Sequence, residues 1–155
     1  MGKDKAKLIL GGRSVLEGIL RTALEVSENA VVMRAPGQDL PRLPEALLEK
    51  VRVGHDLVEG QGPLQGITDA LHLLPENSER VYVLTCDLPY LNREWLLKLS
   101  ASLTEEWDAV VSVGTLHAAL SERPEDGSSN GQTFSRMTGC PFAEGWMRSR
   151  SIKPG

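Results

Sequence analysis

The chain has little cysteine, no long apolar run and no excess of positive charge. Its two cysteines, Cys86 and Cys140, lie far apart without Cys-x-x-Cys spacing, so neither a zinc site nor a disulfide framework is indicated. No apolar run approaches the ~20 residues that cross a bilayer, and the N-terminus shows no signal-peptide pattern. We therefore expect a cytoplasmic protein with no membrane partner.

Charge and histidine spacing exclude further classes. The net charge of −4 argues against a nucleic-acid partner, although a nucleotide can still bind through a metal ion and a few backbone amides. His55, His72 and His117 lack metal-ligand spacing, and no Ser-His-Asp or Cys-His arrangement is apparent. What remains is an ordinary soluble composition, 41% hydrophobic and 25% charged, in a chain of single-domain length.

Strand-type and helix-type patterns alternate from Leu8 to Val113. Short apolar runs occupy residues 8–10, 30–33, 51–53, 81–84 and 109–113. Apolar residues at helical spacing follow them at residues 15–26, 45–50, 63–74 and 93–103. This alternation predicts parallel βαβ units, and hence an α/β fold with a doubly wound, mostly parallel sheet and helices on both faces.

Helix starts are marked in the sequence. Ser14 and Glu17 form a capping-box pattern, and Asn92 can cap the helix that follows it. Pro63 suits the first position of a helix, where the amide hydrogen that it lacks is not needed. We expect helices to begin directly after Ser14, at Pro63 and after Asn92.

The C-terminal part has a different composition. Residues 121–131 are rich in Ser, Pro, Gly, Glu and Asp, and no periodicity is evident from there to the end. We therefore predict a domain over residues 1–115 and an irregular or disordered tail over residues 116–155, with Phe134, Phe142 and Trp146 as anchors. No internal repeat is apparent, and the oligomeric state is not indicated.

Two acidic residues follow separate predicted strands. Asp56 comes after residues 51–53, and Asp87 ends the apolar stretch that begins at Val81. Ligands of open α/β sheets bind outside the carboxyl ends of the strands, so both carboxylates would point into one crevice. An aspartate in the position of Asp87 is equally typical of a simple turn.

A glycine-containing segment leads from Asp56 to the helix predicted at Pro63. Gly60 and Gly62 would give a flexible approach to its N-terminus, whose unpaired amides and partial positive charge suit phosphate or ribose oxygens. The spacing by itself favours the simpler interpretation, a loop that only joins a strand to a helix.

Paired carboxylates at a sheet edge favour magnesium chemistry. Mg²⁺ takes carboxylate oxygens and shares its other positions with water and substrate phosphates. In nucleotidyl transfer an oxygen attacks the α-phosphate of a nucleoside triphosphate, while a metal and a lysine neutralise the charge that develops. The constellation is therefore compatible with a nucleotidyltransferase.

Four segments resemble the molybdenum cofactor guanylyltransferases and the wider MobA-like nucleotidyltransferase group: MGKDKA at Met1–Ala6, the helix entry at Gly12–Glu17, DLVEGQGPLQGI at Asp56–Ile67 and TCDLPYL at Thr85–Leu91. The similarity covers roughly residues 1–111, and the GQGPLQG and CDLPYL pair in this order is fairly specific. The resemblance implies a Rossmann-like fold and Mg²⁺-dependent transfer of a nucleoside monophosphate from its triphosphate to a cofactor precursor.

The resemblance also implies residue roles. Lys5 matches the lysine that reaches the triphosphate, Asp56 the aspartate that helps to hold the nucleotide, and Asp87 the aspartate that binds magnesium. Gly62, Pro63 and Leu64 would pack beneath the nucleotide. Lys5 and Asp87 would thus be catalytic, with Asp87 as the metal ligand.

The chain departs from the family pattern at three places. It begins at the Met-Gly of the motif LAGGxSxRMGxDKA, so we expect it to lack the family's first strand and most of the glycine-rich loop. Aligning LGGRS at Leu10–Ser14 with that loop instead would place MGKDKA before it, in the wrong order. Arg34, Ala35 and Pro36 stand where the family carries an asparagine, and residues 112–155 resemble none of the segments that shape the acceptor site.

The leading hypothesis is transfer of GMP from GTP to a molybdopterin acceptor. CMP transfer to the same cofactor, or transfer of another nucleotide to a related phosphorylated acceptor, is the alternative enzyme activity. A different class of function is a non-catalytic relic that binds nucleotide weakly, or a partner protein in cofactor assembly.

Overall fold

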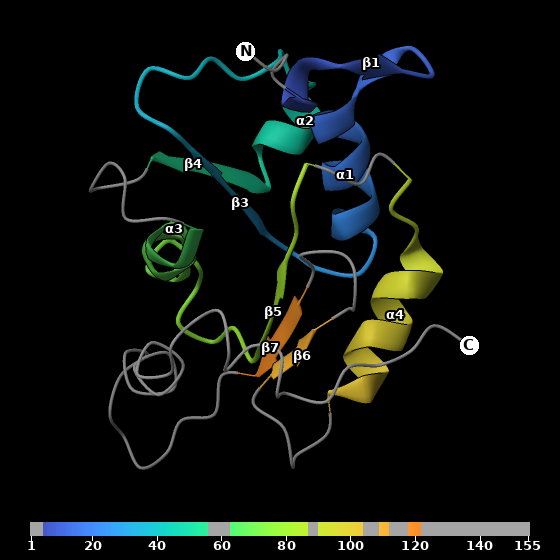
Figure 1. The fold of residues 1–155 in the computed structure, drawn as a ribbon, viewed down its shortest axis with the longest axis vertical. Coiled ribbons are helices and arrows are strands. Elements are labelled where there is room, and N and C mark those ends of the chain that lie inside the picture. Colours follow the sequence, from blue (N-terminus) through green and yellow to red (C-terminus); the bar gives the residue numbers. More distant parts are fainter. Residues whose placement is uncertain (1–4, 56–62, 87–89, 104–108, 112–117, 122–155) are drawn as a thin grey trace. The chain divides into compact units, whose positions relative to one another are not determined.

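The computed structural model describes residues 5–55, 63–86, 90–103, 109–111 and 118–121 (Figure 1). The chain divides into two compact units. The first comprises residues 1–74 and 86–96, and the second comprises residues 75–85 and 97–155. Of the helices in the described ranges, none has the length and apolar character that crossing a membrane requires.

The first unit begins with a 3₁₀ turn, a hairpin and a helix and continues with two strand–helix pairs. In order, these elements are η1 (Lys5–Lys7), β1 (Ile9–Leu10), β2 (Arg13–Ser14), α1 (Val15–Leu24), β3 (Ala30–Arg34), α2 (Glu45–Leu48), β4 (Val51–His55) and α3 (Pro63–Leu71). The second unit contains β5 (Arg80–Val83), β6 (Ala109–Val111) and β7 (Ala118–Ser121), and α4 (Arg93–Ser102) includes residues of both units.

The apolar run at residues 8–10 forms an exposed hairpin and not a strand of the parallel sheet. β1 pairs antiparallel with β2, with Leu10 opposite Arg13. Gly11 and Gly12 make the two-residue loop with φ of 58° and 83°, a backbone that glycine adopts without steric cost and that matches the twist of a tight hairpin. Ile9 is 65% exposed, so this run adds little to the core.

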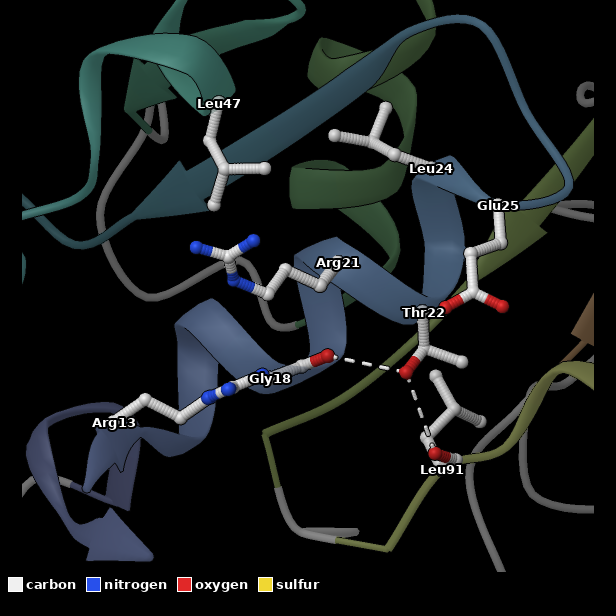
Figure 2. Close-up of a pocket in the computed structure, with 8 residues that line it drawn as sticks. All are labelled: Arg13, Gly18, Arg21, Thr22, Leu24, Glu25, Leu47 and Leu91. Carbon is white, nitrogen blue, oxygen red and sulfur yellow. Dashed lines mark hydrogen bonds between the residues drawn. The ribbon is translucent and has the colours of Figure 1, made fainter. Parts of the chain in front are cut away.

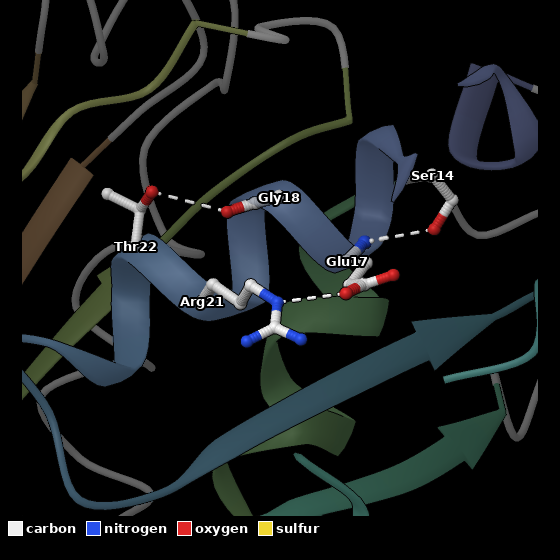
Figure 3. Close-up of polar contacts among 5 residues, drawn as sticks. All are labelled: Ser14, Glu17, Gly18, Arg21 and Thr22. Carbon is white, nitrogen blue, oxygen red and sulfur yellow. Dashed lines mark hydrogen bonds and ion pairs between the residues drawn. The ribbon is translucent and has the colours of Figure 1, made fainter. Parts of the chain in front are cut away.

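Helix α1 begins where the capping pattern predicts. The Glu17 amide donates to Ser14 Oγ at 3.2 Å, which satisfies one of the unpaired amides of the first turn (Figure 3). The Glu17 carboxylate accepts from Arg21 Nε at 2.8 Å, one helical turn onward. The N-cap half of the capping box is therefore confirmed, and the Glu17 side chain forms an ion pair along the helix.

Removing this cap should destabilise the first unit. We expect Ser14→Ala to lower the free energy of unfolding by about 0.5–2 kcal/mol, because the Glu17 amide would lose its acceptor at a position that is only 5% exposed. Urea denaturation followed by circular dichroism measures the change. Ser27→Ala is the matched control: its hydroxyl only donates back to the Ala23 carbonyl, so a loss equal to that of Ser14→Ala would contradict the capping role.

The predicted parallel βαβ arrangement is present in the first unit. β3 and β4 pair in parallel, from Ala30 opposite Val51 to Arg34 opposite His55 (Figure 1). Both strands are longer than their apolar runs predict, because the ladder continues through Arg34 in β3 and through Gly54 and His55 in β4. α3 packs against both strands, α1 against β3 and α2 against β4.

The core of the first unit joins segments that are far apart in the sequence. Its buried members are Ala6, Leu16, Leu20, Val32, Leu43, Leu47 and Val51. Leu43 brings in the proline-rich loop between β3 and α2. Cys86 packs against this cluster as a half-buried residue and follows β5 without being part of it, so it is not the buried strand residue that its apolar surroundings in the sequence suggest.

Gly54 of β4 lies at a position where neighbouring side chains leave no room for a Cβ. A Cβ at this position would lie 2.6 Å from Leu73 Cδ1 and 2.8 Å from Met33 Sδ. We therefore expect Gly54→Ala to force both side chains to move and to cost about 1–3 kcal/mol of stability. Thermal and urea denaturation would measure the loss. Gly18→Ala is the control because the Cβ that it adds meets no atom within 4 Å apart from its neighbours and the backbone of its own helix, so equal destabilisation by the two variants would refute the argument.

The strands of the second unit form one antiparallel sheet. β7 lies between β5 and β6 and is antiparallel to both, with Leu120 opposite Val81 on one side and Ala109 on the other (Figure 1). β7 falls inside residues 116–155, so the expectation of an irregular tail is wrong at residues 118–121. Four residues are too few to show a period, and hydrogen bonds to two neighbours give this segment its strand conformation.

Helix α4 confirms the prediction at Asn92. The Trp95 amide donates to Asn92 Oδ1 at 2.8 Å, and the helix begins at the next residue after Asn92. Leu96 and Leu99 are fully or nearly fully buried, as their spacing predicts, and Leu103 just beyond the helix is buried as well.

Candidate functional site

The carboxyl ends of β3 and β4 meet at one edge. Arg34 and His55 are opposite one another and are the last residues of the two strands. Because the strands are parallel, the segments that follow them leave the sheet on the same side, which is where α/β proteins bind ligands. The predicted nucleotide-binding residue Asp56 is the next residue after His55. Asp56 itself lies outside the described residues.

A tight turn holds Arg34 at this edge. The Gln38 amide donates to the Ala35 carbonyl at 3.0 Å, and Gly37 has φ of 76°, as in a turn with proline and then glycine at its centre. Arg34 Nη1 donates to the Gln38 carbonyl at 2.8 Å. The guanidinium is thus tied to the loop that follows its own strand. No motif in the sequence predicts this contact of Arg34, although the Pro36-Gly37 pair is a signal for the turn.

Helix α3 begins at Pro63, as predicted, and covers the β3–β4 pair. The chain reaches it directly from the carboxyl end of β4 through residues 56–62, which include Gly62 and lie outside the described residues. The backbone of Pro63 and Leu64 forms the first turn of α3, and their side chains are outside the description. A helix start that follows a strand end in this way presents its amides near the ligand edge.

Lys5 lies in η1, next to a buried residue. Ala6 is 7% exposed and belongs to the core, whereas Lys5 is exposed. The Leu8 amide donates to the Lys5 carbonyl at 3.3 Å, and η1 packs against α1. The Lys5 backbone is therefore anchored next to the core, and the residue is exposed.

The residue before Asp87 is also anchored. Cys86 packs against the core that contains Val32 of β3 and Val51 of β4. Asp87 itself, the predicted metal ligand, lies outside the described residues.

Acidic groups in the described ranges form no metal cluster. Within those ranges, no group of three His, Cys, Asp or Glu side chains could hold an ion. Asp69 of α3 is buried and accepts from Gln65 Nε2 at 2.8 Å, one helical turn earlier. Asp69 is thus engaged within its own helix, and the predicted metal ligand remains Asp87.

A separate pocket lies on α1 and contains none of the predicted site residues. Its volume is about 550 Å³, and its walls include Arg13, Arg21 and Glu25 (Figure 2). No sequence pattern indicates this pocket, because its polar residues are spread over β2, α1 and the residue that follows α1, without a recognisable motif.

Comparison with known proteins gives a family match over most of the chain. The MobA-like NTP transferase domain matches residues 1–123, past the predicted domain boundary at residue 115 and through β7. A probable molybdenum cofactor guanylyltransferase of Geobacillus is 29% identical over 110 residues, covering 71% of this chain and 55% of that protein. One of Carboxydothermus hydrogenoformans is 34% identical over 112 residues, covering 72% and 51%. The chain thus spans about half the length of these relatives.

A solved structure is similar in fold. The 4-diphosphocytidyl-2C-methyl-D-erythritol synthase of Anaerococcus prevotii matches with a TM-score of 0.54 and 16% identity, over 73% of this chain and 62% of that one. Together with the parallel β3–β4 pair and its covering helix, this likeness confirms the predicted Rossmann-like α/β fold class.

Proposed function

The chain belongs to the MobA-like NTP transferase family, and from this premise we propose that it binds GTP with Mg²⁺ and transfers GMP to a molybdopterin acceptor. One observation carries the proposal: the family match runs through both motif segments and onto β7, and the relatives that share it are named molybdenum cofactor guanylyltransferases. The fold supports it, since β4 leads from a shared strand edge into α3.

In this proposal Lys5 binds the triphosphate and Asp56 holds the nucleotide, while Gly62, Pro63 and Leu64 pack beneath it. Asp87 is the ligand for Mg²⁺. Support comes from three features: the exposed Lys5 on its anchored backbone, the start of α3 at Pro63, and the contact of Cys86 with the core. Carboxylate oxygens are the donors that Mg²⁺ prefers, so the donor type fits the ion.

In nucleotidyl transfer the main task of the protein is to place positive charge near the reacting phosphate. An acceptor oxygen forms a bond to the α-phosphorus of GTP, the bond from that phosphorus to the bridging oxygen breaks, and pyrophosphate leaves with the electron pair. Lys5 would neutralise the negative charge that develops on the phosphate oxygens. Mg²⁺, when bound, supplies further neutralisation and orients the phosphates. Arg34, the last residue of β3, adds positive charge at the strand edge from which residues 56–62 lead to α3.

Isothermal titration calorimetry with GTP, CTP and ATP in Mg²⁺ buffer tests the proposal. We expect heat with GTP and none with CTP or ATP. A response to CTP instead would favour CMP transfer, and no heat with any of the three would favour a non-catalytic relic or assembly partner. The acceptor and the cytoplasmic location stay predictions from the sequence.

A further inference from the structure

The pocket on α1 has the size and charge pattern of a small-molecule site. About 550 Å³ is within the range that such sites occupy, and all of its lining residues belong to the first unit. We propose that it binds a small phosphorylated polyol, with the phosphate at Arg13 and Arg21 and the hydroxyl groups at Thr22 and Glu25. Its lining contains none of the residues proposed to bind the nucleotide.

Two arginines supply the positive end. Arg21 uses Nε to pair with Glu17 at 2.8 Å, which leaves its two Nη groups for another acceptor (Figure 3). Arg13 is exposed, and no carboxylate of the described residues pairs with it. Guanidinium groups present planar, forked donors that match phosphate oxygens, so a phosphate is the ligand group that this end favours.

Acceptors occupy the other end. In Figure 2 the guanidinium groups lie toward one side of the pocket and Glu25 toward the other. Thr22 Oγ1 donates to the Gly18 carbonyl at 3.2 Å, so its lone pairs remain able to accept. A carboxylate and a hydroxyl acceptor fit ligand hydroxyl donors, and the Glu25 charge repels a second anionic group. A phosphate monoester with hydroxyl groups satisfies both ends.

Gly18 provides the second, independent observation. It stands in the middle of α1, where glycine weakens a helix relative to alanine. Apart from its two neighbours and the backbone of α1 itself, no atom lies within 4 Å of the position that its Cβ would occupy, so packing against other elements does not require a glycine here. The space that a side chain would fill belongs to the pocket wall, which leaves it open to a ligand.

Glycerol 3-phosphate titrated into the ¹⁵N-labelled chain, followed by NMR, tests the proposal. We expect saturable shifts at the amides of Gly18, Thr22 and Glu25. Arg21→Gln or Arg13→Gln should weaken binding at least about tenfold, because each removes a charge-assisted contact. Gly18→Leu should abolish binding while the helix persists, since leucine favours helices and its side chain would enter the pocket. Arg42→Gln, which removes an exposed arginine outside the pocket, is the matched control and should bind unchanged.

Three outcomes would overturn the proposal. The first is the absence of shifts at these amides. The second is shifts that vanish in Lys5→Ala but persist in Arg21→Gln, which would place the probe at the nucleotide site. The third is inorganic phosphate binding as tightly as glycerol 3-phosphate, which would show that the hydroxyl groups are not recognised.

Discussion

Asp87→Asn should abolish the Mg²⁺ dependence of GTP binding and lower the rate of GMP transfer by at least about 100-fold. Asparagine keeps the size and one oxygen of the side chain but removes the charge that a hard cation requires. Loss of a single preorganised electrostatic group at a reaction centre typically costs ~10²–10³ in rate. Calorimetry with GTP in Mg²⁺ and in EDTA measures the binding effect, and pyrophosphate release measures the rate.

The control for this variant is Asp39→Asn, which changes an exposed aspartate in the loop after β3. We expect its GTP affinity to respond to Mg²⁺ as in the unchanged protein. Circular dichroism should show both variants folded, because neither substitution alters side-chain volume appreciably. If Asp87→Asn bound GTP with its Mg²⁺ dependence intact, the metal-ligand role of Asp87 would be wrong even if the family assignment stands.

Lys5→Met should weaken GTP binding by about 10–100-fold, the loss expected when a charge-assisted contact to a phosphate worth ~1.5–3 kcal/mol is removed. Methionine preserves an unbranched side chain, so the backbone of η1 and the buried Ala6 should stay in place. The affinity is measured by calorimetry in Mg²⁺ buffer at fixed ionic strength.

Lys7→Met is a closely matched control, since Lys7 lies in the same 3₁₀ turn and is also exposed. A specific phosphate contact predicts a large loss for Lys5→Met and a small one for Lys7→Met. Equal losses would indicate only a general effect of positive charge, and no loss for Lys5→Met would refute the role that the resemblance implies.

Sequence patterns could predict only those residues of the candidate site that belong to short, continuous motifs. Lys5, Asp56 and Asp87 are identified by short sequence patterns, and their roles stay predictions because two of the three lie outside the described residues. Arg34 and the α1 pocket were missed. The Arg34 contact depends on a turn, and the pocket depends on a surface formed by several elements. Residue spacing in the sequence does not predict either arrangement.

The sequence by itself determined where the helices begin and, in α1 and α4, which apolar residues are buried. Ser14, Pro63 and Asn92 act on amides or backbone angles within a few residues, so their effect does not depend on the rest of the chain. Only the tertiary structure decided how the strands pair. β7 becomes a strand because two distant segments supply its hydrogen bonds, and the run at Leu8–Leu10 folds into an exposed hairpin because its partner is the adjacent β2. Strand pairing is a property of two segments at once, and neither segment encodes it alone.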